Sequence, residues 1–345
     1  MMKLKNTLYL LDENFYIHAM NNNIVIKKFG KIINRIPIHI IDSILCFNYM
    51  GVTPDVFKLC NINNVTLTFL SPSGSFMGHL VGESHGNVYL RREQYRIADD
   101  KPRAIKYARN MIFGKICNQK YVLDSFLSKN RKFCDLKFEK AIEKLTESLK
   151  LVLELEDFES LRGVEGDAAR AYFSVFDHMI LKDKENFCFN GRNKRPPKDR
   201  VNALLSYGYA LLNTSVKSAL ESIGLDSYVG FFHTDRPGRA SLALDMMEEF
   251  RPILVDRFIL NLINLEQIKK KDLVIKESGA VLLNDDAKRN FLKLWNERKH
   301  NEIFHPFAEE NTKIGLLPFI QAQQLSRTIR NEIDLYPPFI LKVGG

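Results

Sequence analysis

This chain of 345 residues lacks the features that mark several common protein classes. Its cysteines are few, and no two of them form a C-x-x-C pair, which argues against a zinc site of thiolates and favours reduced, buried thiols in a cytoplasmic protein. They are Cys46, Cys60, Cys117, Cys134 and Cys188. No stretch reaches about 18 uncharged apolar residues, and the N-terminal sequence MMKLKNTLYLLDENFY has acids but no small-residue cleavage site. We therefore expect neither secretion nor a membrane span.

Signatures of small-nucleotide chemistry are also missing. The sequence has no Gly-rich phosphate loop and no H-x-D cluster of ligands, which argues against a phosphohydrolase of mononucleotides. What is present is positive charge, because 50 Lys and Arg residues oppose 41 Asp and Glu residues and leave a net charge of +9. Such an excess favours a polyanionic partner, since each cation placed against a phosphate releases a condensed counterion.

The period of the hydrophobic residues changes once along the chain. Up to about residue 95, segments such as FYIHAM and IVIKK, with turns at NNN and SPSG, indicate strands. From about residue 103 the period is near 3.6 residues, which is typical of helices. One helical stripe consists of Ile105, Ala108, Ile112 and Ile116. We predict an α+β fold with a small N-terminal β-sandwich domain at 1–97 and a larger, mainly α-helical domain at 98–345. The charged segment RIADDKPR at 96–103 resembles a hinge between them.

Positive charge gathers near this hinge and in a loop further along the chain. The loop GRNKRPPKDR at 191–200 carries five basic residues against one acid, and its two prolines forbid helix. A solvated surface is the alternative explanation for such charge. If the chain binds DNA, these side chains are the candidate phosphate contacts. The candidates are Arg91, Arg92, Arg96, Arg103, Arg192, Lys194, Arg195 and Lys198.

The first candidate for chemistry is Glu165, in the segment LRGVEGDAARAYF at 161–173. Its neighbours are mostly glycine and alanine, which let a ligand or another backbone approach closely. The alternative is a surface glutamate on a tightly packed helix.

The second candidate segment is GFFHTDRPGRASLALDMMEEFRP at 230–252. His233 follows two phenylalanines, and Ser241 is a candidate N-cap of the next helix. On that helix Asp245 and Glu248 are three residues apart and share one face, with Glu249 also within reach of Asp245. A hydrogen-bonded core histidine and a solvated acidic face are the alternatives. Carboxylates with one imidazole suit Mg²⁺ or Mn²⁺, which could activate a phosphodiester.

Four ordered segments give the chain a family resemblance over nearly its whole length. They are RGVEGDAARAYF, NKRPPKDRVNALLSYGYALL, FFHTDRPGRASLALDMMEEFRP and FIQAQQLSRTIR. In this order they resemble the first-numbered CRISPR-associated (Cas) proteins of type I systems, which are prokaryotic integrases that insert new spacers. The resemblance implies Glu165, His233 and Glu248 as metal ligands and Asp245 as an auxiliary acid, with Glu249 as the rival for the third ligand.

The resemblance also implies a reaction and partners. The 3′-hydroxyl of a captured double-stranded DNA fragment would attack a phosphodiester at the border of a CRISPR repeat, or water would cleave DNA as in an endonuclease. The N-terminal domain would mediate a homodimer, which would dock on a small ferredoxin-like protein, the second-numbered Cas protein. The alternative is a non-catalytic DNA-binding scaffold of a defence complex, in which a partner supplies the chemistry.

Overall fold

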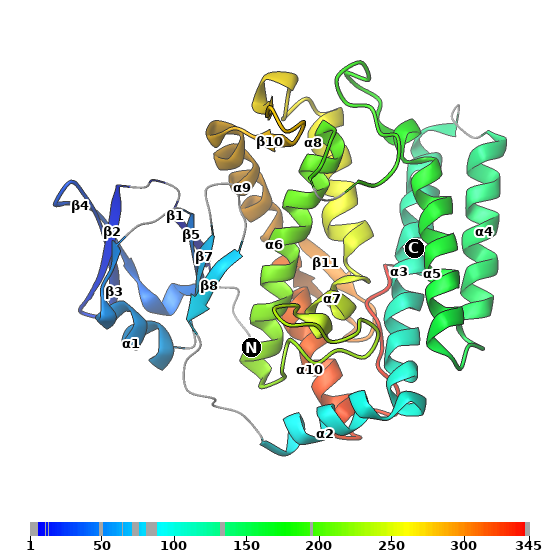
Figure 1. Cartoon of the computed structure of the whole chain (residues 1–345), viewed down its shortest axis with the longest axis horizontal. Helices are drawn as coiled ribbons and strands as arrows, with labels where there is room; N and C mark the ends of the chain where they lie inside the picture. The colour runs from blue at the N-terminus through cyan, green and yellow to red at the C-terminus, as the bar shows by residue number, and fades with distance from the viewer. Residues whose placement is uncertain are drawn as a thin grey trace. The chain divides into compact units, whose positions relative to one another are not determined.

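The computed structural model describes residues 6–10, 12, 14–47, 51–63, 65–70, 76–80, 88–131, 135–193 and 196–341. The chain divides into two compact units. The first comprises Met1–Gly86, Arg289–Asn301 and Lys313–Leu316, and the second comprises Asn87–Lys288, Glu302–Thr312 and Leu317–Gly345. The α+β class predicted from the sequence is confirmed, with a strand-rich N-terminal region followed by a mainly helical one (Figure 1). The domain division at 97/98 stays a prediction.

The first unit contains two four-stranded sheets. One has the order β1-β5-β7-β8 and the other the order β4-β3-β2-β6. In the first sheet the pairs β1–β5 and β5–β7 are parallel and β7–β8 is antiparallel, whereas β2, β3 and β4 form an antiparallel meander. The strands are β1 (Asn6–Leu10), β2 (Phe15–Met20), β3 (Asn23–Lys28), β4 (Lys31–Pro37), β5 (Ile41–Phe47), β6 (Gly51–Val52), β7 (Thr66–Leu70) and β8 (Phe76–Leu80).

Both sheets contribute to one hydrophobic core. Ile17 and Ile24 come from one sheet and Ile44 and Leu67 from the other, and all four are fully buried. Helix α1 (Pro54–Ile62) adds Val56 and Cys60 to the same core. The region up to about residue 95, which was expected to consist of strands, therefore contains helix α1 and also most of helix α2 (Val88–Asp99), neither of which the strand pattern predicted. The predicted NNN turn joins β2 to β3 through residues 21 and 22, which have the positive φ angles of a tight hairpin. The SPSG turn lies outside the described residues.

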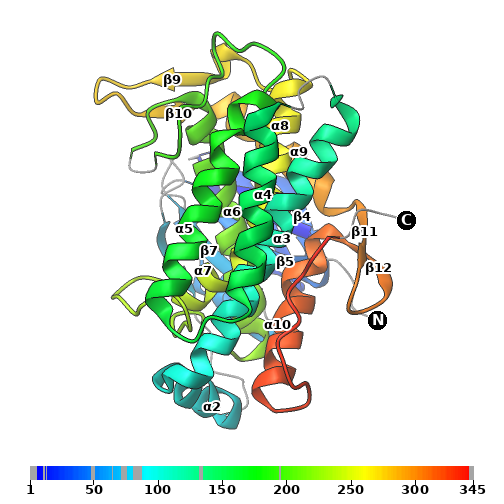
Figure 2. The same ribbon diagram turned by 90° about the vertical axis from the view of Figure 1, so that its right-hand side faces the viewer.

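Long helices dominate the second unit. Figure 2 shows α3, α4 and α5 side by side, and α10 packs against α6. Its helices are α2 (Val88–Asp99), α3 (Lys101–Lys129), α4 (Leu136–Val152), α5 (Phe158–Ser174), α6 (Arg200–Ile223), α7 (Ser241–Met247), the π-helix η4 (Arg251–Asp256), α8 (Arg257–Asn264) and α10 (Leu317–Ile329). The hairpins β9–β10 (Leu273–Ile275, Val281–Leu283) and β11–β12 (Glu302–His305, Glu310–Lys313) follow, and helix α9 (Asp285–Lys299) lies mostly in the first unit.

Aspartates set where four of these helices begin. Asp100, Asp135, Asp157 and Asp199 each accept a hydrogen bond from a backbone N–H of the first turn, and so cap α3, α4, α5 and α6. The stripe predicted on α3 is buried along its whole length. The segment at 96–103 is therefore the junction of two helices at Asp100.

Some local expectations need correction. Ser241 is the first residue of α7 and does not cap it, because its hydroxyl donates to the carbonyl oxygen of Thr234 at 3.2 Å. Cys188 is exposed, in contrast to the buried thiols expected, while Cys46 and Cys60 are free and buried. Within the described residues, none of the helices is long and apolar enough to cross a membrane.

Candidate metal centre

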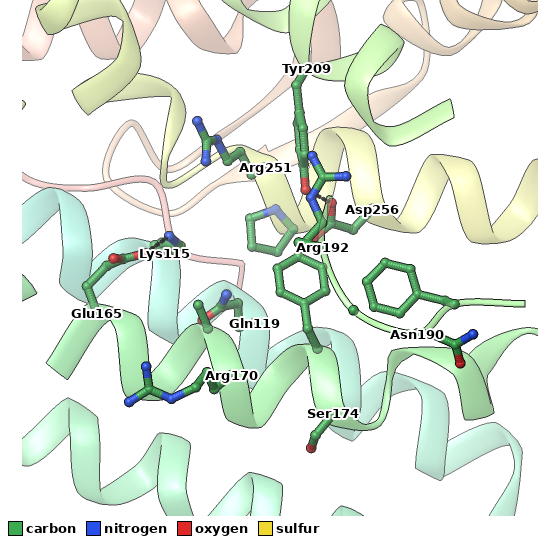
Figure 3. A pocket seen from close by; sticks show the side chains of 15 residues that line it. Lys115, Gln119, Glu165, Arg170, Ser174, Asn190, Arg192, Tyr209, Arg251 and Asp256 are labelled. Atoms are coloured by element: carbon green, nitrogen blue, oxygen red, sulfur yellow. Dashed lines mark hydrogen bonds and ion pairs between the residues drawn. The ribbon is translucent and has the colours of Figure 1, made fainter. Parts of the chain in front are cut away.

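Three segments that are distant in the sequence meet at the ammonium group of Lys115. Lys115 lies on α3, Glu165 on α5 and Glu248 directly after α7. The ammonium contacts Glu165 Oε1 and lies 2.7 Å from Glu248 Oε2. The side chains of Lys115 and Glu248 are 8% and 4% exposed, against 25% for Glu165. Two of the three predicted ligands thus share one buried positive charge, and Figure 3 shows Lys115 and Glu165 turned toward each other.

Glu248 is ionised although it is buried. Burial by itself raises the pKa of this carboxyl, but the cations beside it, Arg251 and Lys115 above all, lower the pKa to about 2. Arg251 Nη1 lies 3.0 Å from Glu248 Oε1. The Lys115 ammonium lies 2.7 Å from Glu248 Oε2, and this oxygen accepts no other hydrogen bond from the described residues. This oxygen is buried and has lone pairs to offer a cation.

His233 is held in place by Asp245. Asp245 Oδ1 lies 2.6 Å from His233 Nδ1 and accepts the backbone N–H of His233 at 2.9 Å. Asp245 Oδ2 accepts the backbone N–H groups of Phe231 and Phe232 at 2.6 and 2.9 Å. A carboxylate on Nδ1 assigns the proton to that nitrogen and leaves Nε2 with its lone pair, which is the usual arrangement of a histidine ligand. Asp245 therefore orients His233 from a position without solvent exposure.

A glycine makes room for this carboxylate. A Cβ on Gly230 would lie 2.8 Å from Asp245 Oδ2 and 2.8 Å from the backbone carbonyl carbon of Ser241. Neither atom can move cheaply, because the backbone atom belongs to α7 and the carboxylate is hydrogen-bonded on both oxygens. Close approach, and no special backbone angle, explains the glycine at this position.

Glu249, the rival third ligand, has a different set of partners. The hydroxyl of Tyr336 donates to Glu249 Oε1 at 2.8 Å, and the backbone N–H of Phe339 donates to Oε2 at 3.0 Å. Burial raises the pKa of the Glu249 carboxyl to about 8. Asp245, Glu248 and Glu249 are all buried, so the alternative of a solvated acidic face on this helix is wrong.

A cavity of about 590 Å³ lies beside Lys115 and Glu165. Arg192, Tyr209 and Asp256 group together on another part of its wall (Figure 3). The Tyr209 hydroxyl donates to Asp256 Oδ1 at 2.5 Å, and burial raises the pKa of the Asp256 carboxyl to about 6. The cationic side chains of the wall are Lys115, Arg170, Arg192 and Arg251. Positive charge therefore dominates the cavity next to the candidate ligands.

Aromatic contacts hold two of these cations. The guanidinium carbons of Arg192 and Arg251 lie 5.2 and 5.1 Å from the centre of the Tyr209 ring, within range of cation–π attraction. Two buried atoms of the wall, Gln119 Oε1 and Arg251 Nε, have no hydrogen-bond partner among the described residues. Fixed cations and an unused N–H donor, such as that of Arg251 Nε, suit the oxygens of a phosphodiester, which accept hydrogen bonds.

The arginines predicted near the hinge lie on α2 and at the start of α3. Arg92 and Arg96 are exposed, and Arg91 is half-buried. Arg96 and Arg103 both pair with Glu93, at 3.3 and 2.6 Å. Part of the charge of this segment is therefore neutralised within the protein.

The loop candidates separate into different environments. Arg192 lines the cavity and donates to Asn202 Oδ1, so it is not a solvated loop residue. Lys198 is exposed, and its backbone N–H donates to Asn193 Oδ1 at 2.8 Å. Lys194 and Arg195 lie outside the described residues.

The predicted ligand set fits a hard cation in its chemistry. Across the residues that the structure describes, no group of three or more His, Cys, Asp or Glu side chains is arranged to hold a metal ion. Glu165 and Glu248 instead surround an ammonium, and His233 is oriented beside them through Asp245. Two carboxylates and an imidazole remain a suitable donor set for Mg²⁺ or Mn²⁺. Coordination by Glu165, His233 and Glu248 stays a prediction.

Sequence reasoning missed Lys115, Gln119 and Arg251. A signal for the first two was present, because Lys115 and Gln119 continue the face of Ile112 and Ile116 at helical spacing, and polar residues in an apolar stripe are buried for a reason. Arg251 gave no such signal, because an arginine that follows two glutamates is just as typical of an ion pair on the surface as of a buried site.

A family model described as CRISPR associated protein Cas1 matches residues 8–297. A CRISPR-associated endonuclease Cas1 of Chlorobaculum tepidum is 43% identical over 99% of both chains. The chain belongs to the Cas1 family. A second Cas1 endonuclease, from Rhodospirillum rubrum, is 42% identical and covers 99% of this chain and 100% of its own. The family resemblance predicted from the four segments is confirmed.

Solved structures share the Cas1 fold. A Cas1 protein from Thermotoga maritima matches with a TM-score of 0.80 at 23% identity, covering 94% of this chain and 97% of its own. A casposase bound to integration product matches with a TM-score of 0.82 at 22% identity, covering 99% and 96%. A chain of a partial Cas6-RT-Cas1–Cas2 complex, 25% identical, matches with a TM-score of 0.64 and covers 98% of each chain.

Proposed function

We propose that the chain is a metal-dependent DNA integrase and endonuclease of CRISPR adaptation, which inserts foreign DNA fragments as new spacers. The observation that carries the proposal is the pair of carboxylates, Glu165 and Glu248, held against one buried positive charge. Two carboxylates at such short range repel each other strongly unless a cation lies between them. Two relatives of the chain, at 43% and 42% identity, are named endonucleases, which supports the same class of reaction for this chain.

In this proposal Glu165, His233 and Glu248 hold Mg²⁺ or Mn²⁺. When bound, the ion would stabilise the charge on the attacking and leaving oxygens of a phosphodiester. Asp245 is a positioning residue, because it contacts His233 and backbone N–H groups. Arg251 keeps Glu248 ionised at 3.0 Å and would stay as its partner during the reaction.

The cationic cavity is the proposed path of the DNA strand. The 3′-hydroxyl of a captured fragment would attack a phosphodiester at the repeat border, so that one P–O bond forms as another breaks and no external energy source is needed. Arg170 and Arg192 would contact phosphates of the bound strand. With water as the attacking group, the same residues would cleave DNA.

We infer that the chain acts as a homodimer through its N-terminal β-sandwich, together with the small second-numbered Cas protein. The chain of the Cas6-RT-Cas1–Cas2 complex, at 25% identity and with 98% of each chain covered, supports a partner of this kind. Double-stranded DNA is the proposed ligand of the assembly, and the exposed Arg92, Arg96 and Lys198 are candidate contacts outside the cavity.

A strand-transfer assay tests the proposal. It would use a DNA fragment with a free 3′-hydroxyl, a plasmid carrying a CRISPR repeat, the small partner, and Mg²⁺, Mn²⁺ or chelator. We expect Glu165→Gln to lower transfer at least about a hundredfold, because it removes one charged ligand. Glu159→Gln, an exposed change on the same helix, serves as the control.

The same assay separates the enzyme from the scaffold. Full transfer by Glu165→Gln in the presence of metal would contradict the site assignment. A protein that binds DNA equally with chelator and with metal, and neither joins nor cuts strands, would be a non-catalytic scaffold.

A further inference from the structure

We propose that Lys115 is a built-in counter-ion that occupies the cation position between Glu165 and Glu248, and that a metal ion binds only by displacing its ammonium group. The inference rests on the proposed metal site and adds a residue that the sequence motifs did not include. It concerns the metal-free state of that site and how the state changes on loading.

The first support is the geometry of the ammonium. Lys115 projects from the buried face of α3 and contacts Glu165 Oε1, with its nitrogen 2.7 Å from Glu248 Oε2. A cation ligated by both carboxylates must approach the same oxygens. An ammonium and a divalent ion that contact the same pair of oxygens would repel each other, and burial leaves little water to screen that repulsion.

The second support is the burial of this contact. The side chain of Lys115 is 8% exposed, and its nitrogen has a carboxylate on two sides. A second cation cannot reach those two oxygens while the ammonium stays there. The side chain therefore has to move.

The third support is the space beside the lysine. Lys115 and Glu165 line the cavity of about 590 Å³, which gives the flexible four-carbon side chain room to swing away. Arg251, the other cation on Glu248, is different, because its guanidinium also packs 5.1 Å from the Tyr209 ring centre. Of these two, the lysine is the cation suited to leave and the arginine the one suited to stay.

In the protein without metal, the ammonium of Lys115 reduces the repulsion between the two carboxylates. Without a counter-ion, the buried carboxylates would repel each other and distort the site. With Lys115 between them, Glu165 and Glu248 stay close together before a metal arrives. The lysine therefore keeps the site assembled and at the same time lowers its affinity for the metal.

Metal titration of three variants tests the inference. Lys115→Met keeps an unbranched side chain that is one atom shorter and removes the charge. We therefore expect Mn²⁺, measured by calorimetry, to bind about tenfold more tightly than to the unaltered chain. Lys120→Met is the control, because Lys120 lies on the same helix and pairs with Asp124 at 2.7 Å, outside the cavity wall. Its Mn²⁺ affinity should not change.

Glu165→Gln separates the two proposals. One outcome is that Glu165→Gln abolishes Mn²⁺ binding, while Lys115→Met binds Mn²⁺ equally or more weakly than the unaltered chain. The proposed metal site would then be supported, and the displacement of Lys115 by the metal would be wrong. If Glu165→Gln binds Mn²⁺ normally, both the proposed metal site and the displacement are wrong.

A measurement on the unaltered chain avoids any folding defect of Lys115→Met. A small amine-reactive reagent followed by mass spectrometry reports how accessible each lysine is. We expect the modification of Lys115 to rise several-fold when Mg²⁺ is added, because the ammonium moves into the cavity, while Lys120 as internal reference stays constant. No rise at Lys115 under conditions where calorimetry shows bound metal would overturn the inference.

Discussion

Glu248 and Glu249 are neighbours in the sequence and have opposite environments. The cations beside Glu248, Arg251 and Lys115 above all, outweigh burial and hold its pKa at about 2. Burial raises the pKa of Glu249 to about 8, since the hydrogen bonds that it accepts compensate only in part. At neutral pH one carboxyl is therefore ionised and the other carries a proton.

The second environment is made by the C-terminal segment. Tyr336 and Phe339 donate to the two carboxyl oxygens of Glu249, and Gln321 donates to Oε1 at 3.1 Å. Asn118 on α3 binds the same segment, because its Nδ2 donates to the carbonyl oxygen of Phe339 at 2.8 Å. Glu249 is therefore part of a closed network of hydrogen bonds with the C-terminal segment.

The difference shows which acid is suited to bind a cation. A metal ligand has to be deprotonated, and it needs an oxygen that is not committed elsewhere. Glu248 meets both conditions once Lys115 moves away, because among the described residues Oε2 has only the ammonium of Lys115 beside it, whereas both oxygens of Glu249 accept hydrogen bonds. We therefore propose Glu248, and not Glu249, as the third ligand.

The largest expected effect comes from exchanging these two acids for amides. Glu248→Gln should lower strand transfer by about two to three orders of magnitude, because the site loses an ionised ligand. Glu249→Gln should keep transfer within a few-fold, because glutamine resembles the protonated acid. Both are measured by the strand-transfer assay at equal amounts of folded protein. Equal losses of strand transfer in the two variants would mean that Glu248 and Glu249 do not differ in their role.

Asp256 is a third buried acid, and the cations near it reduce the rise in pKa that burial causes. Its pKa rises only to about 6, from an ordinary value of 3.8, with Tyr209 as donor and Arg192 close by. Because the folded pKa is raised, this group's contribution to stability is complete below about pH 3.8 and is lost as the pH rises through about 6.

Asp256→Asn should remove this pH dependence. Relative to the unaltered chain, the variant should gain up to roughly 3 kcal/mol of unfolding free energy between about pH 4 and pH 7 and then remain level. Urea unfolding in chelating buffer measures the unfolding free energy, with Asp124→Asn, at the half-buried pair with Lys120, as control. A constant difference at all pH values would mean that Asp256 is not protonated in the folded state.

Asp245 differs from Glu248 and Glu249, because it acts on the proposed site through His233. Asp245→Asn should weaken Mn²⁺ binding about 10- to 100-fold, since the amide no longer selects the tautomer that leaves Nε2 free. Calorimetry at several pH values measures the affinity. Unchanged affinity in a folded variant would show that the orientation of His233 does not depend on this carboxylate.

The smallest expected effect lies on the C-terminal side. Tyr336→Phe removes the hydroxyl that donates to Glu249 and should cost about 1 to 2 kcal/mol of unfolding free energy, with strand transfer nearly unchanged. Tyr95→Phe is the control, because its hydroxyl donates to Asp226 at an exposed site and should cost much less. A large loss of transfer in Tyr336→Phe would mean that the two sides of the helix are coupled.

Much of the fold could be predicted from periodicity. The strand segments and the stripe on α3 are local signals, and the structure contains them as expected. The N-cap predicted at Ser241 is wrong, and the aspartates that do cap helices were not predicted. Helices α1 and α2 were missed, because they lie in a region where strands prevail.

The site could be predicted only in part. The motifs named Glu165, His233, Asp245 and Glu248, but helical spacing could not separate Glu248 from Glu249. Their partners come from α3, from the π-helix and from the C-terminal segment, which lie far away in the sequence. Spacing along one helix carries no information about such contacts.

The sequence by itself determined the family, the α+β class and the acids that could take part in chemistry, because these depend on ordered motifs and on local periodicity. The tertiary structure alone decided which acid is ionised, which nitrogen of His233 stays free, and that Lys115 lies between two carboxylates. The physical reason is that the charge state of a buried group depends on the groups that folding brings within a few ångströms of it.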